Sequence, residues 1–304
     1  MEWKFELVAG PYAGPTYGVA WDGKGLLFSA ISENSILRYD PERGSVTEFR
    51  KYMAGIRGLG FDAEGNFYGC QSSSRRIVRF NRDGSTSPME HKFEGKFHNH
   101  PYDLTVDRQG RIWFSDPVDP APTRGPQLHG PLEHQSVLRL EKRTDGTWEI
   151  KRMTYDTQTP GAVVMAQDQR TLYVAENSNR ADGKRELRAY PIQQDGSLGA
   201  LVVLHTFGSD PRGLHRGVHG MCLDSEGNIL VCAGWERSGP GPMIYVLSPS
   251  GRVLQTHPTP ADQPLMCAFG DTDLGTLYIT TEGGHLYRVR NTGRQGWLLY
   301  PRSR

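Results

Sequence analysis

Short apolar runs of five to six residues alternate with polar turns along the whole chain. Each unit consists of an apolar run, a turn that mostly contains Asp or Gly, and a second apolar run, as in "YGVAWDGKGLLFSA" and "HGMCLDSEGNILVCA". This pattern predicts pairs of β-strands joined by tight hairpins. Six such units begin at residues 17, 57, 102, 161, 219 and 266, so they recur every 40 to 59 residues. Helical periodicity is essentially absent.

A third apolar run follows each hairpin, as in "SILRYDPERG" and "SVLRLEKRTDG", and a more variable fourth run comes next. Four strands in each of six repeats predict an all-β, six-bladed β-propeller with four antiparallel strands per blade. The terminal segments "KFELVA" (4–9) and "WLLY" (297–300) are predicted to close the ring, because an unclosed propeller exposes a sheet edge. No linker divides the sequence, so residues 1–304 are predicted to form one domain.

Composition and charge narrow the functional classes. The 304 residues carry a formal net charge of +1, which gives no reason to expect a nucleic-acid or membrane partner. No apolar run approaches the roughly 18 residues of a membrane helix, and "MEWKFELVAG" lacks the pattern of a secretion signal. The four cysteines include no CxxC pair, which favours free thiols and a cytoplasmic location. A small-molecule substrate is the expected partner, and no pattern assigns an oligomeric state.

The topology of a propeller places the candidate site at one face. The first strand of each blade lines the central channel, and the short Asp/Gly turns lie at the far end from the long loops. Long loops on a rigid face usually carry function, and the Pro/Gly-rich loop 117–135 is a plausible lid. The channel mouth on that face should be ringed by the first residues of the six inner strands, which are Tyr17, Arg57, Tyr102, Gly161, His219 and Met266.

Other polar residues are predicted to approach the same mouth. Asp103 follows Tyr102, and Asp116 and Glu176 end second strands on this face. His98, His100, His134 and His215 lie on its loops, and Trp235 is a candidate for its rim. The predicted catalytic set is His219, Tyr102, Tyr17 and Asp103. The predicted substrate-binding set is Arg57, Glu176, His100, Met266 and Trp235.

Several stretches resemble the senescence marker protein/gluconolactonase/luciferin-regenerating enzyme family. They are "NHPYDLTVDRQGRIWFSDP", "TLYVAENSN", "VHGMCLDSEGNILVCAGW" and, most specifically, "PSGRV…TPADQP…CAFG…LGTLYITT". The resemblance runs from about residue 12 to residue 292. It implies a six-bladed propeller, lactone hydrolysis and a calcium or zinc ion at the channel mouth.

The sequence departs from this family where the metal ligands are expected. The family's Glu is replaced by Tyr17, two Asn by Tyr102 and Gly161, and an Asp by His219, while Asp103 is retained. A further Asn is replaced by Met266. Calcium takes six or more oxygen ligands, so we expect the family metal to be absent and no other cofactor to replace it. A zinc ion held by His215 and His219 with His98 or His100 is the alternative.

The substituted mouth still offers chemistry. Phenols can donate hydrogen bonds to a developing oxyanion, Arg57 can bind a carboxylate or enolate, and His219, titrating near neutrality, can move a proton. We therefore predict a metal-independent lactonase-like hydrolase. The alternatives are a metal-free lyase or isomerase on a similar substrate, as in the related strictosidine synthase propeller, and a non-catalytic propeller that binds a small molecule.

Overall fold

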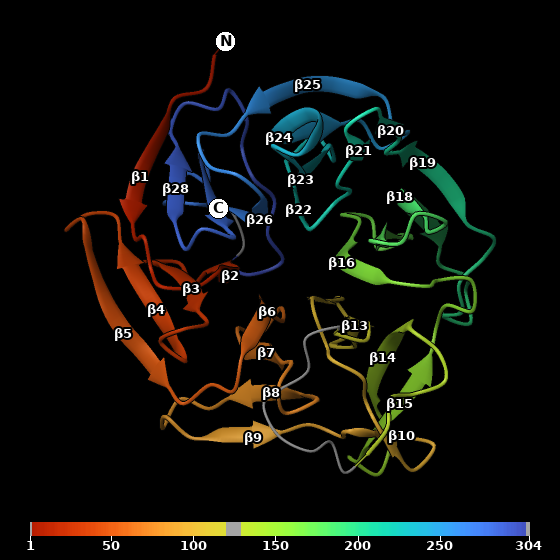
Figure 1. Ribbon diagram of the computed structural model, residues 1–304. Coiled ribbons are helices and arrows are strands. Elements are labelled where there is room, and N and C mark those ends of the chain that lie inside the picture. Colours follow the sequence, from red (N-terminus) through yellow and green to blue (C-terminus); the bar gives the residue numbers. More distant parts are fainter. Residues whose placement is uncertain (1, 120–128, 302–304) are drawn as a thin grey trace.

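The protein is described by a computed structural model of residues 2–119 and 129–301, in which all regular structure is β-strand. Six four-stranded antiparallel sheets are arranged as blades around a central channel (Figure 1). The predicted six-bladed propeller is therefore confirmed. No helix in these residues is long and apolar enough to span a membrane.

The first three blades follow the chain without a break in strand order. Blade 1 consists of β2 (Thr16–Trp21), β3 (Leu26–Ala30), β4 (Ser35–Asp40) and β5 (Ser45–Lys51). Blade 2 consists of β6 (Ile56–Phe61), β7 (Phe67–Gln71), β8 (Arg76–Phe80) and β9 (Thr86–Pro88). Blade 3 consists of β12 (Leu104–Val106), β13 (Ile112–Asp116), β14 (Ser136–Lys142) and β15 (Trp148–Arg152).

The other three blades complete the ring. Blade 4 consists of β16 (Pro160–Met165), β17 (Thr171–Asn177), β18 (Arg185–Pro191) and β19 (Val202–Thr206). Blade 5 consists of β22 (Gly220–Leu223), β23 (Ile229–Trp235), β24 (Ser238–Leu247) and β25 (Val253–Pro258). Blade 6 consists of β26 (Pro264–Gly270), β27 (Thr276–Thr281), β28 (Leu286–Val289) and the N-terminal strand β1 (Phe5–Ala9).

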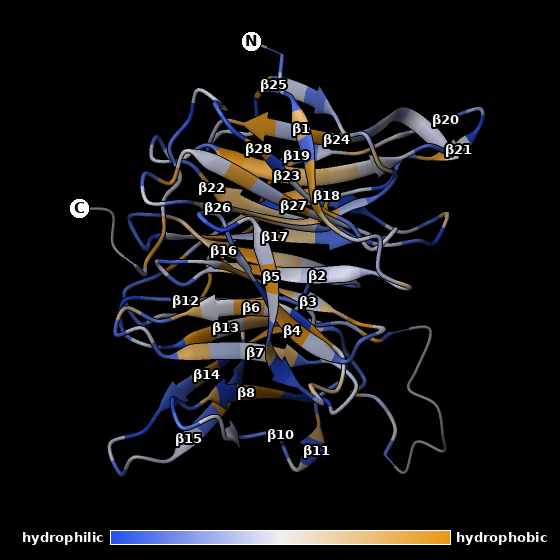
Figure 2. Ribbon diagram, turned by 90° about the vertical axis from the view of Figure 1, so that its left-hand side faces the viewer, coloured by the Kyte–Doolittle hydropathy of each residue, from blue (hydrophilic) through white to orange (hydrophobic). Residues whose placement is uncertain are grey.

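Two short hairpins lie outside the blades. They are β10 (Lys92–Phe93) with β11 (Lys96–Phe97), and β20 (Ser209–Asp210) with β21 (Gly213–Leu214). The second hairpin projects from one face of the ring (Figure 2). Apolar residues concentrate in the strands and polar residues in the connections, as the alternation in the sequence indicates (Figure 2).

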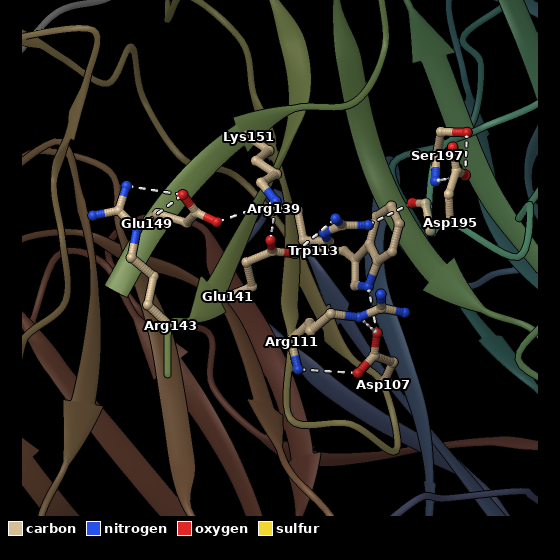
Figure 3. Close-up of polar contacts among 11 residues, drawn as sticks. Asp107, Arg111, Trp113, Arg139, Glu141, Arg143, Glu149, Lys151, Asp195 and Ser197 are labelled. Carbon is tan, nitrogen blue, oxygen red and sulfur yellow. Dashed lines mark hydrogen bonds and ion pairs between the residues drawn. The ribbon is translucent and has the colours of Figure 1, made fainter. Parts of the chain in front are cut away.

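Four of the turns between first and second strands are stabilised in the same way, by an Asp side chain. Asp22, Asp62, Asp107 and Asp224 each accept hydrogen bonds from backbone N–H groups two to four residues later. Such Asx turns satisfy backbone donors that the hairpin leaves unpaired. Asp107 in addition accepts from the indole N–H of Trp113, which lies between Arg111 and Arg139 (Figure 3). The Asp107 carboxylate therefore fixes both the turn and the strand that follows.

The outer part of blade 3 carries a network of surface charges. Glu141 on β14 pairs with Lys151 on β15, and Glu149 pairs with both Lys151 and Arg143 (Figure 3). The Arg143 side chain is half exposed, at 53%. Exposed pairs of this kind contribute about 0–1 kcal/mol each to stability, so they do not determine the fold of the blade.

The ring is closed by the N-terminal strand. β1 pairs antiparallel with β28, with Phe5 opposite Val289 and Glu6 opposite Arg288. The predicted contribution of "KFELVA" to ring closure is therefore confirmed. The C-terminal segment 297–300 is not a strand of that sheet, which corrects its predicted role.

The segment 297–300 instead crosses the channel at the face of the Asp/Gly turns. The Trp297 N–H donates to the Leu223 carbonyl of blade 5, and the Tyr300 ring contacts Phe61 of blade 2 at 5.5 Å between centroids. Because β1 occupies the edge of the blade 6 sheet, these residues lie against the inner strands instead. A cavity of about 150 Å³ remains in the channel between this segment and the opposite mouth.

Candidate active site

The beginnings of the inner strands gather aromatic side chains at one end of the channel. The rings of Tyr17 and Tyr102 meet edge to face with centroids 5.9 Å apart, and both pack against Leu265 and Met266. The guanidinium carbon of Arg57 lies 5.2 Å from each tyrosine ring centroid. Blades 1, 2, 3 and 6 thus each supply part of the predicted mouth, whereas Gly161 of blade 4 supplies no side chain.

His219 of blade 5 completes this cluster through a hydrogen bond. Its Nδ1 lies 3.0 Å from the Tyr102 hydroxyl and 3.4 Å from an Arg216 amino group. Because a guanidinium can only donate, Nδ1 is the acceptor and Tyr102 donates its hydroxyl proton to it. The backbone holds both partners, since Tyr102 N–H donates to Ser115 and His219 N–H donates to Cys232.

The charge states of this pair follow from burial and from the neighbouring cations. Burial, together with the positive charges of Arg216 and Arg57, lowers the pKa of His219 well below its usual value. Burial raises the pKa of Tyr102 well above its usual range and also raises that of Tyr17. The imidazole and both phenols are therefore neutral at pH 7. The expectation that His219 titrates near neutrality is wrong, because it did not take into account the burial of the imidazole or the charge of Arg216 beside it.

Three charged residues at this site were missed in the sequence. Asp119 forms an ion pair with Arg57 at 2.5 Å. Glu282 follows β27 and, like Arg216, acts on the mouth through its charge. All three lie on connections at the predicted functional face, and Arg216 stands only three positions before His219. The short distance in sequence from His219 could have identified Arg216 as a candidate. A position in a loop, however, does not determine where the side chain points.

His100 and Met266 lie beside the cluster. The Nδ1 atom of His100 accepts the backbone N–H of Asp119 at 2.9 Å, so His100 helps to place the partner of Arg57. Met266 is 5% exposed and packs against the tyrosine rings. The predicted lid 117–135 is described only in part, since residues 120–128 lie outside the described residues.

Asp103 lies deeper in the channel than the Tyr102–His219 pair. Its Oδ2 accepts the backbone N–H of Val163 from blade 4 at 3.1 Å, and its side chain lines the 150 Å³ cavity. Burial raises the pKa of Asp103 to about 7. A carboxyl group with this pKa could exchange protons at neutral pH, so its predicted catalytic role stays a prediction.

Two carboxylates predicted to lean over the mouth hold the scaffold instead. Glu176 is fully buried, accepts the backbone N–H groups of Gln158 and Thr159, and forms an ion pair with Arg188 at 3.3 Å. Burial raises the pKa of Glu176, and these donors oppose the shift. Asp116 is 1% exposed and accepts the Asn99 N–H. Both residues end strands at the predicted face, but their carboxylates point into neighbouring loops. We therefore do not count Glu176 among the substrate-binding residues.

Trp235 lies at the rim beside the mouth. Its indole N–H donates to the Leu214 carbonyl at 3.1 Å and to Ser238 Oγ at 2.7 Å. The guanidinium carbons of Arg216 and Arg237 lie 5.7 and 5.4 Å from its ring centroid. Arg216 therefore connects the Trp235 rim to the Tyr102–His219 pair.

The donor atoms at the mouth do not suit the divalent cation that the family resemblance implies. Calcium needs six or more oxygen ligands. The mouth supplies phenols, an imidazole, a thioether, the two guanidiniums of Arg57 and Arg216, which repel a cation, and the Asp119 carboxylate, which is paired with Arg57. Within residues 2–119 and 129–301, no three His, Cys, Asp or Glu side chains are grouped so that they could hold a metal ion. The four histidines considered for zinc are among these residues.

Comparisons with known proteins agree with this architecture. Residues 15–283 match the family model described as the SMP-30/Gluconolactonase/LRE-like region. A gluconolactonase of Zymomonas mobilis is 26% identical over 90% of this chain and 77% of its own length. A 6-deoxy-6-sulfogluconolactonase of Pseudomonas putida is 29% identical over 62% of this chain and 55% of its own length.

A solved structure agrees with the fold as well. A gluconolactonase from Xanthomonas campestris superimposes with a TM-score of 0.77 and 27% identity, over 95% of this chain and 89% of its own. The predicted class of lactone hydrolase agrees with the names of these relatives, and the match to the family model covers most of the chain. The chain belongs to the SMP-30/gluconolactonase/LRE-like family.

Proposed function

We propose that this protein hydrolyses a small-molecule lactone without a bound metal ion. The observation that carries the proposal is the hydrogen bond between Tyr102 and a neutral His219 beside two guanidiniums, at the mouth where the family resemblance places a metal. Family membership supports lactone chemistry, and the cationic side chains supply the electrostatic role that a metal would otherwise fill.

The Tyr102–His219 pair can move the proton in both halves of the reaction. As the oxygen of a water molecule bonds to the lactone carbonyl carbon, one water proton passes to the Tyr102 hydroxyl, which hands its own proton to Nδ1 of His219. When the ring C–O bond breaks, the same path returns the proton to the leaving alkoxide. The product is a hydroxy acid, and no proton is gained or lost by the enzyme.

The two guanidiniums can stabilise the charge that develops during this reaction. Arg57 and Arg216 both lie close enough to lower the pKa of His219, so they disfavour its protonation while the site is empty. A tetrahedral oxyanion bound between them supplies the missing negative charge at the moment when the imidazole becomes protonated. Preorganised charge of this kind is typically worth several kcal/mol per donor in a buried site.

Metal independence leads to a direct assay. After dialysis against a chelator, hydrolysis of five- and six-membered aldonolactones should retain its kcat within twofold, because no step needs a cation. The measurement is acid release in a pH-stat, with elemental analysis of the same sample. Added Ca²⁺ or Zn²⁺ is the control, and a metal that restores more than a tenfold loss would contradict the proposal. Binding of lactones without turnover would instead favour the non-catalytic alternative.

The pH dependence identifies the proton acceptor. The lowered pKa of His219 means that its neutral form persists well below pH 6.5, so kcat/KM should stay constant through pH 6.5 and fall only in more acidic solution. If Asp103 were the base, kcat/KM would fall near its pKa of about 7. A profile of kcat/KM from pH 4 to 8, repeated with Asp103→Asn, separates the two residues.

A further inference from the structure

A second cavity lies next to the mouth and is lined by four arginines. It measures about 260 Å³ and is formed by parts of 178–185, 212–216 and 235–238. The first follows β17, the second includes β21, and the third begins at the end of β23, and all lie between blades 4 and 5 (Figure 1). The arginines are Arg185, Arg212, Arg216 and Arg237.

Three of these four cations have no acidic partner in the described part of the chain. Arg212 pairs with Asp210 at 2.8 Å, but no carboxylate of the described residues lies within 4.0 Å of Arg185, Arg216 or Arg237. Glu282 and Asp262 act on Arg216 only from a greater distance. The cavity therefore presents an excess of positive charge.

Two of these cations also have unused hydrogen-bond donors. The Nε atoms of Arg185 and Arg216 are buried and donate to no partner in the described residues. A buried donor without an acceptor costs about 1–3 kcal/mol, and a guanidinium without a counter-ion costs more. An incoming group with several anionic oxygens would supply both the missing hydrogen-bond acceptor and the missing counter-ion, because guanidiniums bind such groups through paired donors.

Trp235 gives this cavity a rigid wall. Its indole N–H is held by Leu214 and Ser238, and the guanidiniums of Arg216 and Arg237 both lie within 6 Å of its ring. The flat ring keeps the two cations in place, and the Nε–H group of Arg216 remains available for a ligand. The arrangement is thus preorganised, which reduces the entropy lost on binding.

Arg216 belongs to the cavity and also contacts His219 at 3.4 Å. A ligand with an anionic group in the cavity would therefore extend past Arg216 toward the reacting pair. We propose that the arginine-lined cavity binds an anionic oxygen group, a phosphate, sulfonate or carboxylate, that is carried by the lactone substrate. This inference rests on the proposed lactonase function and specifies its substrate class.

The test compares a neutral aldonolactone with the same lactone carrying a terminal phosphate. We expect kcat/KM to be at least tenfold higher for the phosphorylated lactone, and Arg237→Gln to reduce that ratio about tenfold. Arg237 is exposed and holds no ion pair in the described chain, so its replacement should not disturb folding. Arg143→Gln removes an exposed arginine from blade 3 and is the matched control.

Calorimetric titration with inorganic phosphate tests the cavity without turnover. Wild-type protein should bind phosphate at least tenfold more tightly than Arg237→Gln, and phosphate should compete with the phosphorylated lactone. Equal kcat/KM values for the two lactones would overturn the inference and leave the lactonase proposal intact, even if free phosphate binds. Absence of turnover with every lactone would overturn the proposed function, and the titration would then still decide whether the cavity binds anions.

Discussion

Replacing Tyr102 with Phe should lower kcat for lactone hydrolysis by about a hundredfold. The substitution keeps the ring that packs against Tyr17 and Met266 but removes the hydroxyl that lies 3.0 Å from His219 Nδ1. Proton transfer by a positioned group contributes about 10²–10⁴ to a rate. His219→Ala should cause a loss of similar size, and the double variant should be no worse than either single variant, because the two residues form one path. Stopped-flow or pH-stat assays at saturating substrate measure these rates.

Tyr17→Phe is the matched control for this prediction. It removes a phenol hydroxyl from the same cluster without breaking the hydrogen bond to His219, so kcat should fall less than in Tyr102→Phe. Thermal unfolding of all variants should establish that they are folded at the assay temperature. Full activity in both Tyr102→Phe and His219→Ala would leave the proposed chemistry without a basis.

Replacing Glu176 with Ala should destabilise the protein by about 3 kcal/mol or more, the cost of breaking a buried ion pair. The variant leaves Arg188, which is 1% exposed, with a weaker set of partners. It also leaves the backbone N–H groups of Gln158 and Thr159 without their acceptor. Urea unfolding with an unchanged m value measures the loss.

Kinetics distinguish this scaffold role from substrate binding by Glu176. At a temperature where the variant is folded, KM for the lactone should stay within twofold of wild type. Glu186→Ala is the graded control, because Glu186 also pairs with Arg188 at 2.7 Å but is partly exposed. A raised KM with unchanged stability would restore Glu176 to the binding site.

The ring of inner strands could be predicted because it depends on periodic features. Asp22, Asp62, Asp107 and Asp224 stand at equivalent turns, so the repeat and the strand order follow from their spacing. The same reasoning placed Tyr102 and His219, which are 117 residues apart in sequence, at one end of one channel. Topology determines which end of a strand a residue occupies, and that was sufficient for residues whose side chains point inward.

The remaining errors come from the direction of side chains and from the charges around them. Glu176 ends its strand at the predicted face, but its carboxylate points to Gln158 and Thr159. The pKa of His219 is lowered by burial and by the charges of Arg216 and Arg57, and the Arg216 guanidinium packs over the Trp235 ring. The segment 297–300 has the apolar composition of a strand, yet β1 occupies the edge of the blade 6 sheet. None of these contacts produces a repeating pattern in the sequence.

The pairing of β1 with β28 has a consequence for synthesis of the chain. Glu6 and its partner Arg288 are 282 residues apart, so β1 leaves the ribosome long before the strand with which it pairs. At about 5–20 residues per second, β1 waits roughly 15–55 s for its neighbour. During that interval the earlier blades can fold in order, while β1 remains an unpaired strand on the nascent chain. Blade 6 can thus be assembled only after the five blades that lie between its strands in the sequence have been synthesised.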